Sequence, residues 1–145
     1  MRITQEADYA LRILFCLAKR KEKTDATTLA TLVGITPRFA LKILRKLNLE
    51  GLVESYKGAC GGYMLAREAG EISLKDAIEA IDGPIMLNKC LDDGYECSRM
   101  GKAKDFCSVH CVFCRINADL SQKFSSVSIK DLIDDDFNIE NLKLD

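Results

Sequence analysis

The sequence predicts a mainly α-helical fold with one small β-hairpin, and three observations support this class. Apolar residues recur at helical spacing in several segments, one pair of strand-like runs flanks a glycine-rich turn, and capping residues stand at the helix boundaries. At 145 residues, with 48% hydrophobic and 30% charged residues, the chain suits one compact domain or a small domain with a docking arm. It is too short for two full-sized enzyme domains.

The chain begins with two predicted helices. Residues 4–19 carry apolar side chains on one helical face, and Thr4 is a good N-cap residue. The polar run 19–25 has no period and predicts a loop. A short helix is expected over residues 26–33, with Gly34 placed for a left-handed C-cap.

A third helix is expected from Thr36 and Pro37, an N-cap followed by a first-turn proline, to about Glu50. The short glycine-containing turn before it is typical of a helix-turn-helix. Its apolar stripe consists of Ala40, Ile43, Leu44 and Leu47. A second face carries Arg38, Lys42 and Arg45. Taken alone, this basic face is more typical of an ordinary solvated helix surface.

A hairpin follows the third helix. Residues 52–57 and 63–67 read as strands, and the glycine-rich run 58–62 reads as their turn. Helix, helix, recognition helix and hairpin in this order predict a winged helix-turn-helix, with the basic helix in the major groove of DNA. Lys57, near the hairpin tip, is expected to contact phosphate.

The C-terminal half is organised differently. Ser73 is expected to cap a helix through Ile81, residues 85–110 form a long loop without a period, and a helix is expected from Ser108 or Cys111 to Ser125. The apolar stripe of this last helix is Phe113, Ile116, Leu120 and Phe124. We interpret it as a dimerisation helix, the alternative being that it folds back on its own domain. A short helix over 128–133 and an acidic tail complete the chain.

These elements give three predicted parts. Residues 1–84 form the winged helix-turn-helix domain, 85–110 a cysteine-rich loop, and 111–145 the dimerisation helix with the acidic tail. Charge follows the same division, because residues 1–70 hold twelve bases and seven acids, whereas the remainder holds nine and fifteen. A basic first half with an acidic second half is expected of a DNA reader with a separate control region.

Other classes of protein are disfavoured. The longest apolar run, Ile13 to Ala18, is far shorter than the roughly 20 residues of a membrane span, so we expect a soluble, cytoplasmic chain that makes no membrane contact. One histidine, no paired-carboxylate motif and no phosphate-binding glycine loop leave little for catalysis, so an enzyme is not expected.

Five of the seven cysteines fall within 25 residues, in the pattern C-x6-C-x9-C-x3-C-x2-C. They are Cys90, Cys97, Cys107, Cys111 and Cys114. Thiolates are soft ligands, and four of them complete an iron-sulfur cluster or a zinc site, so both remain open, with the cluster favoured. The last three also lie at i, i+4 and i+7, a spacing that small apolar residues on one helical face would share.

The other candidate ligands are interpreted more simply. Cys16 lies among apolar residues and is expected to be buried. Cys60 stands at the hairpin tip, where a redox-sensitive thiol is the alternative to an inert one. His110 is interpreted as a surface histidine, the alternative being a cluster ligand.

Three stretches together resemble the winged-helix family that includes the IscR, NsrR and CymR repressors. They are the opening MRITQEADYALR, the hairpin sequence GLVESYKG with GGYMLAR after it, and the later cysteines. The resemblance covers nearly the whole chain. It implies a homodimer on a dyad-symmetric promoter site of double-stranded DNA, held by a long C-terminal helix from each subunit. In one branch, cysteines ahead of that helix hold [2Fe-2S] or [4Fe-4S].

The resemblance also implies roles for particular residues. Cys90, Cys97 and Cys111 match the family's cysteine positions, with Cys107 as an alternate for Cys111. Cys114 matches a histidine ligand, and Asp8 matches a carboxylate supplied by the partner subunit, so these two are rival fourth ligands. The positions matching DNA-facing residues are Thr36, Arg38, Phe39 and Lys42 on the recognition helix and Lys57 and Gly58 on the wing. Asn117 stands where many members have tryptophan, and Cys60 replaces a hairpin glycine.

The resulting hypothesis is a dimeric DNA-binding transcriptional regulator, and specifically a repressor. Its expected input is iron-sulfur cluster status, redox state or nitric oxide, sensed through the cysteines. The alternative is a cluster-free or zinc-binding regulator of the same family, controlled by a protein partner or by cysteine metabolism.

Overall fold

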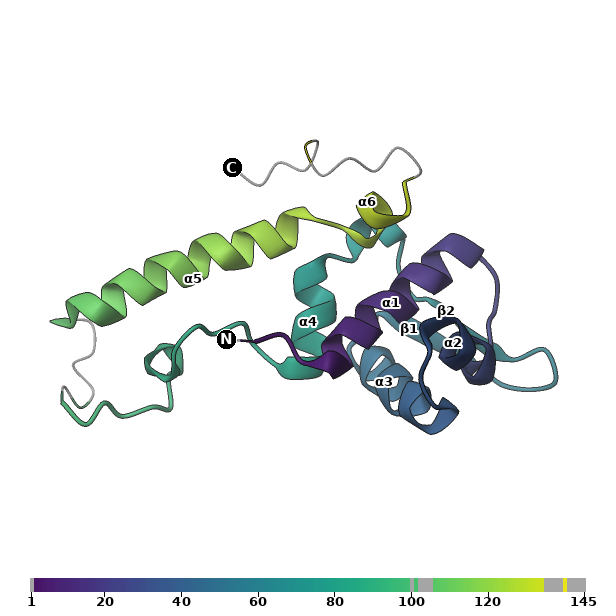
Figure 1. Cartoon of the computed structure of the whole chain (residues 1–145), viewed down its shortest axis with the longest axis horizontal. Coiled ribbons are helices and arrows are strands. Elements are labelled where there is room, and N and C mark those ends of the chain that lie inside the picture. Colours follow the sequence, from purple (N-terminus) through teal and green to yellow (C-terminus); the bar gives the residue numbers. More distant parts are fainter. Residues whose placement is uncertain (1, 100, 102–105, 135–139, 141–145) are drawn as a thin grey trace.

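The computed structural model describes residues 2–99, 101, 106–134 and 140. Its larger elements are α1 (Gln5–Arg20), α2 (Ala26–Val33), α3 (Pro37–Leu49), β1 (Val53–Tyr56), β2 (Gly62–Leu65), α4 (Leu74–Asp82), α5 (Ser108–Ser126) and α6 (Ile129–Ile133). Two short 3-10 turns are η1 (Ala69–Glu71) and η2 (Lys89–Leu91). The predicted fold class, mainly α with one hairpin, is confirmed (Figure 1).

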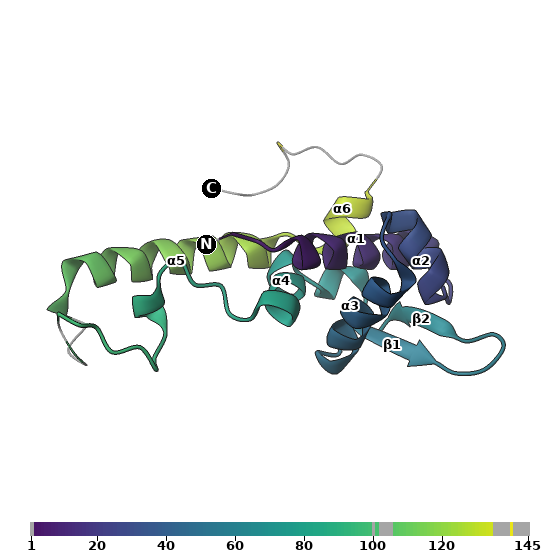
Figure 2. The same cartoon turned by 60° about the horizontal axis from the view of Figure 1, so that its bottom comes forward.

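Helix α1 is the centre of the globular part. It packs against α2, α3, α4, α6 and β2, which surround it in Figures 1 and 2. Its fully or nearly fully buried residues are Ala7, Ala10, Ile13, Leu14, Leu17 and Ala18. The small alanine side chains let neighbouring backbones approach closely, while the larger residues fill one continuous core with the apolar stripe of α3.

Local capping chemistry sets most helix boundaries as predicted. The Thr4 hydroxyl accepts a hydrogen bond from the Ala7 amide at 3.2 Å. Gly34 ends α2 with a φ of 78°, a left-handed conformation that costs glycine little. The Thr36 hydroxyl caps α3, and Ser73 and Asp76 form a reciprocal capping box at the start of α4.

The helix-turn-helix and hairpin have the expected arrangement. The chain bends by 107° between α2 and α3, within the range of helix-turn-helix motifs. Strands β1 and β2 pair antiparallel, with Val53 opposite Leu65 and Tyr56 opposite Gly62. The strands are shorter than the predicted runs, although the Ala66 amide still donates to the Leu52 carbonyl at 3.0 Å just outside them.

The predicted loop 19–25 is partly wrong. Helix α1 continues to Arg20, and Thr24 is buried, where its amide donates to the Tyr63 carbonyl at 3.1 Å and its carbonyl accepts from the Tyr63 amide at 2.9 Å. Gly62 makes this close approach possible, because a Cβ there would lie 2.9 Å from the Thr24 carbonyl. The end of β2 next to the turn is therefore fixed to the segment between α1 and α2.

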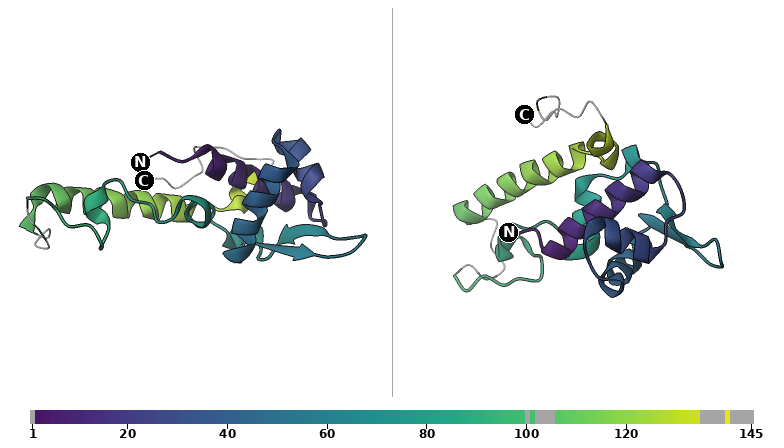
Figure 3. Two further views of the ribbon diagram at one scale, coloured as in Figure 1. Left: turned by 90° about the horizontal axis from the view of Figure 1, so that it is seen from below. Right: turned by 45° about the vertical axis from the view of Figure 1, so that its right-hand side comes forward.

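Helix α5 extends away from the globular part as a long arm (Figures 1 and 3). The chain then returns, since the Leu74 amide donates to the Val127 carbonyl at 2.9 Å and the Ile129 amide donates to the Ile72 carbonyl at 2.8 Å. Helix α6 thereby packs on the core through the fully buried Ile129.

Within the described ranges, no single helix combines the length and apolar character needed to cross a membrane. The strongly bent pair α2 and α3 meets that criterion of length and composition only when its members are taken together.

Candidate nucleic-acid interface and cysteine segment

Helix α3 divides its surface between the core and solvent. Its residues Ala40, Ile43, Leu44 and Leu47 are completely buried. Arg38, Lys42 and Arg45 are exposed on other faces, as the sequence predicted. A helix anchored by one stripe presents its remaining side chains at fixed positions, which groove recognition requires.

Two other residues assigned to the DNA-facing set have structural roles. Thr36 is exposed, but its hydroxyl accepts the Phe39 amide at 3.3 Å as the N-cap of α3. The Phe39 ring is half-buried and packs edge-to-face on Tyr9, with 5.9 Å between centroids. Phe39 thus differs from a freely exposed contact residue, since its ring joins α3 to α1.

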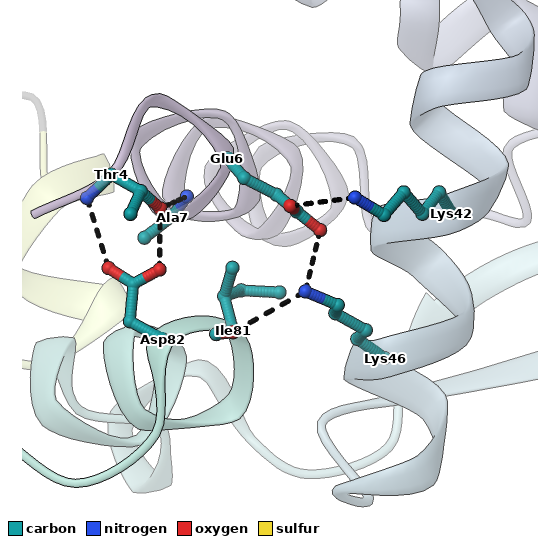
Figure 4. Close-up of polar contacts among 7 residues, drawn as sticks. All are labelled: Thr4, Glu6, Ala7, Lys42, Lys46, Ile81 and Asp82. Carbon is teal, nitrogen blue, oxygen red and sulfur yellow. Dashed lines mark hydrogen bonds and ion pairs between the residues drawn. The ribbon is translucent and has the colours of Figure 1, made fainter.

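An acidic side chain from α1 lies against the basic face of α3 (Figure 4). Glu6 places one carboxylate oxygen 3.0 Å from Lys42 Nζ and the other 2.8 Å from Lys46 Nζ. The Glu6 side chain is only 18% exposed, whereas that of Lys42 is 58% exposed. Burial acts to raise the pKa of Glu6, but the two ammonium groups together outweigh it and hold that pKa below its ordinary value.

This ion pair was missed in the sequence because Glu6 and Lys42 are far apart along the chain. The pairing neutralises part of the basic face while leaving Lys42 accessible. Lys46 lies deeper and also donates to the Ile81 carbonyl at 3.4 Å, so Glu6 and Lys46 connect α1, α3 and α4. Glu6 therefore helps to fix the position of α3 and neutralises part of the positive charge on this helix.

The hairpin adds a second basic surface. Lys57 and Gly58 are exposed at its tip, and Gly58 has a φ of 98°. Lys23, from the segment that the sequence assigned to a plain loop, places its ammonium 4.4 Å from the centre of the Tyr56 ring. Such a cation–π contact brings another base to the end of β1 next to the turn.

Helix α5 carries an exposed apolar surface. Val109, Val112 and Ile116 are 59%, 56% and 48% exposed, although they lie at helical spacing. Three members of the predicted stripe, Phe113, Leu120 and Phe124, are half-buried within the chain. Part of the predicted stripe therefore folds back, and a neighbouring stripe faces solvent.

Asn117 connects α5 to the preceding segment. Its side-chain oxygen accepts the Leu87 amide at 3.0 Å, and its side-chain nitrogen donates to the Ile85 carbonyl at 2.9 Å. The Asn117 side-chain amide thus satisfies one backbone donor and one backbone acceptor of the irregular segment. These two hydrogen bonds explain why a polar residue stands at this position. The sequence did not reveal this role, because the partners lie in a segment without a period.

The five clustered cysteines lie on both sides of the α5 start. Cys90 in η2, Cys97 and Cys107 are half-buried, whereas Cys111 and Cys114 are exposed on α5. Across the described residues, no three histidine, cysteine or acidic side chains lie close enough together to hold a metal ion. The thiolate donor set suits an iron-sulfur cluster or zinc, but among the described residues these thiols are not brought together.

Two rival ligands are placed differently from each other. His110 is 8% exposed, so its interpretation as a surface histidine is wrong; its Nε2 lies 3.3 Å from Cys114 Sγ, one helical turn away. Asp8 remains on the surface of α1 and pairs with Arg12 at 2.8 Å. The burial of His110 depends on packing of the irregular segment against α5, which helical periodicity does not report.

The two remaining cysteines lie in the globular part. Cys16 is half-buried at the edge of the core, and burial raises the pKa of its thiol. Cys60 is exposed on the hairpin. Its φ is not positive, so its backbone conformation is one that any residue adopts.

The 107° helix pair, the exposed bases on α3 and the adjacent hairpin define a winged helix-turn-helix protein of the DNA-binding class. Residues 3–135 match the sequence model of the Rrf2 family, described as "Iron-dependent Transcriptional regulator". The chain belongs to the Rrf2 family. The similar proteins of known class are transcriptional regulators and not enzymes.

Individual relatives agree with this assignment. Rv1287 of Mycobacterium tuberculosis, named as a candidate HTH-type transcriptional regulator, is 42% identical over 87 residues, 59% of this chain. That match spans about half (54%) of the relative's length. IscR of Xenorhabdus nematophila is 26% identical over 92% of this chain and 79% of its own. The structure of CymR, the global cysteine regulator of B. subtilis, covers 92% of this chain and 96% of its own, with TM-score 0.72 and 25% identity.

We predict that Glu6→Gln lowers the free energy of unfolding by about 1 kcal/mol near neutral pH, because two ammonium groups lose their carboxylate partner. Since the folded-state pKa of Glu6 is depressed, its contribution is complete above the ordinary value of 4.5 and disappears as the pH falls through the folded-state value. Urea unfolding at a series of pH values measures both effects.

Asp8→Asn is the matched control for this prediction. Asp8 also belongs to α1, but its ion pair with Arg12 is exposed, so the substitution should change stability little. Equal losses in the two variants, or a Glu6→Gln deficit that persists in acid, would contradict the role assigned to Glu6.

Proposed function

We propose that the chain acts in the cytoplasm as a dimeric repressor that places α3 in the major groove and the hairpin along the phosphate backbone. The observation that carries this proposal is the exposure of Arg38, Lys42 and Arg45 on a helix whose opposite stripe is completely buried. Guanidinium groups suit the edges of guanine, and lysines suit phosphates. Lys57 and Gly58 supply the wing contact.

Dimerisation through α5 is supported by its exposed apolar surface. Val109, Val112 and Ile116 lie at helical spacing along the arm, and Phe106, which precedes the helix in the sequence, is 86% exposed. Apolar side chains in such a contiguous set are typical of a protein interface. Two copies held together by this arm would present two recognition helices to half-sites about 34 Å apart on a dyad-symmetric site.

For the control input, we propose that Cys90, Cys97, Cys111 and Cys114 hold an iron-sulfur cluster, with Cys107 as alternate to Cys111 and Asp8 of a second copy as alternate fourth ligand. The cluster supplies redox and nitric-oxide chemistry when bound. Support comes from the thiolate content of the segment, the iron-dependent description of the family and the relative named IscR. Zinc at the same thiolates is the alternative metal.

The chain's own residues give this segment a route to the DNA reader. Asn117 ties the segment root to α5, and Asp82 at the end of α4 accepts hydrogen bonds from the Thr4 amide and hydroxyl at the start of α1 (Figure 4). A rearrangement around the cysteines is thereby transmitted to α1 and, through Glu6, to α3.

A second candidate is a cluster-free regulator controlled by a protein partner. Two observations favour it: the described cysteines do not converge, and the fold neighbour CymR is the global cysteine regulator of B. subtilis. In this candidate, the exposed thiols Cys111 and Cys114 would take part in contacts or in oxidation rather than in metal binding.

For DNA binding, we predict that Lys57→Ala weakens affinity for every duplex and reduces the salt dependence of binding, since a phosphate contact is lost. Arg38→Ala should instead reduce discrimination between operator and unrelated duplex by about 1–3 kcal/mol. Fluorescence anisotropy over a series of salt concentrations measures both, with Lys89→Ala in η2 as a control of equal charge change. Identical behaviour of the Lys57 and Arg38 variants would contradict this division.

For assembly, we predict that Ile116→Asp raises the dimer dissociation constant at least about 100-fold, because a carboxylate would be buried in an apolar contact. Sedimentation velocity over a range of concentrations measures it. Ala118→Asp adds the same charge two residues further along α5, on a different face, and should leave the dimer intact. An Ile116→Asp variant that remains dimeric would remove α5 from the interface.

For the metal, anaerobic reconstitution of the full chain with iron and sulfide should give a brown protein with both elements bound. The Cys90→Ala/Cys97→Ala double variant should lose them, whereas Cys16→Ala should retain them. Iron and sulfide analysis with absorbance spectroscopy provides the measurement. A colourless protein with about one zinc per chain would favour the alternative metal, and normal DNA binding by the double variant in all redox conditions would favour the cluster-free candidate.

A further inference from the structure

A cavity of about 640 Å³ lies away from the recognition helix and from the clustered cysteines. Its walls come from the end of α1, strand β2 and the turn after it, and helix α6. These are the elements that pack together around the C-terminal half of α1. The volume falls in the range of sites that take metabolite-sized ligands, which is roughly 300–1,000 Å³.

The inner walls of this cavity are apolar. Leu17 and Ala18 of α1 line it and are 2% and 4% exposed, so they are part of the permanent core. Leu65, Ala69 and Ile133 complete this side and are half-buried. Such walls would bind a short hydrocarbon or aromatic group through burial of apolar surface.

The rim carries an excess of bases. Lys21, Arg67 and Lys130 come from three different elements and are all exposed at the cavity. Two acids also line it. Glu22 is already held by Arg20 at 2.6 Å, and Arg20 does not line the cavity, which leaves Glu68 as the one acid against three bases. In the described part of the chain, none of the three rim bases lies in an ion pair with a carboxylate.

Lys21 occupies this rim at a conformational cost. It is the C-cap of α1 with a φ of 54°, and within the described ranges it is the only residue other than glycine with a positive φ. Glycine is the residue that a left-handed C-cap favours. A charged side chain kept at a strained position beside a cavity indicates a role for that side chain beyond folding.

We propose that this cavity binds a small organic carboxylate with a short apolar body. The carboxylate meets the ammonium and guanidinium groups of Lys21, Arg67 and Lys130, and the apolar body fills the space against Leu17, Leu65 and Ile133. Charged hydrogen bonds to the carboxylate fix orientation, while apolar burial supplies affinity. Because Arg67 and Leu65 continue from the wing, the ligand would join the hairpin base to α1 and α6.

The test is a titration of the full chain with sodium hexanoate, observed by methyl NMR. The methyl signals of Met64 and Ile133, which line the cavity, should shift saturably, whereas those of Met86 and Ile116 should not. Hexanamide, which lacks the charge, and acetate, which lacks the apolar body, should each bind about tenfold more weakly or not at all. No DNA is needed, so the result is independent of the DNA-binding proposal.

Variants separate a binding role of Lys21 from a structural one. Lys21→Gln keeps the strained backbone and should weaken hexanoate binding about tenfold. Lys21→Gly should weaken binding equally while raising the Tm by about 3 °C, because glycine relieves the left-handed strain. Lys19→Gln removes one exposed charge from the same helix end, outside the cavity, and should leave binding unchanged.

Three outcomes would overturn the proposal. The first is the absence of saturable shifts at Met64 and Ile133. The second is equal binding of hexanoate and hexanamide, which would indicate unspecific apolar association. The third is unchanged hexanoate affinity in both Lys21 variants and in Arg67→Gln, since the rim bases would then have no part in binding.

Discussion

The burial of α1 is the constraint on which the rest of the structure depends. A helix that contacts four other helices and one strand needs a broad apolar face, and this face of α1 is almost fully excluded from solvent. Its polar groups, among them Asp8 and Arg12, lie on the solvent side and at its two ends. Glu6 at one end faces the recognition helix, and Lys21 at the other end borders the cavity. The buried helix α1 thus connects the ion pairs with α3 to the cavity beside Lys21.

Two different kinds of contact hold the DNA-reading parts on this helix. Helix α3 is held by its apolar stripe and by ion pairs to Glu6, so its position responds to charge as well as to packing. The hairpin is held by backbone hydrogen bonds between Thr24 and Tyr63, which have no dependence on pH or salt of that kind. Ionic conditions should therefore act on the recognition helix more than on the wing.

The sequence predicted the elements whose causes are local. Thr4, Gly34, Thr36 and Ser73 set helix boundaries through contacts within a few residues, and the apolar periodicity of α1 and α3 reports their buried faces. Features that arise from distant contacts were missed or misread. The Glu6–Lys42 pair and the burial of His110 depend on how separate segments meet, and no local pattern records that. The roles of the clustered cysteines and of the DNA-facing residues remain predictions, because their ligands would come from outside the chain.

The close approach of Gly62 to the Thr24 backbone has a mechanical consequence. Gly62 and Tyr63 belong to the end of β2 next to the turn, so these contacts hold the hairpin close to its tip against the segment between α1 and α2. A hairpin that is already held in place loses little conformational entropy when it binds a duplex, because few of its bonds must stop rotating. The wing is therefore preorganised for DNA binding, so that more of the binding free energy remains for discrimination between DNA sequences.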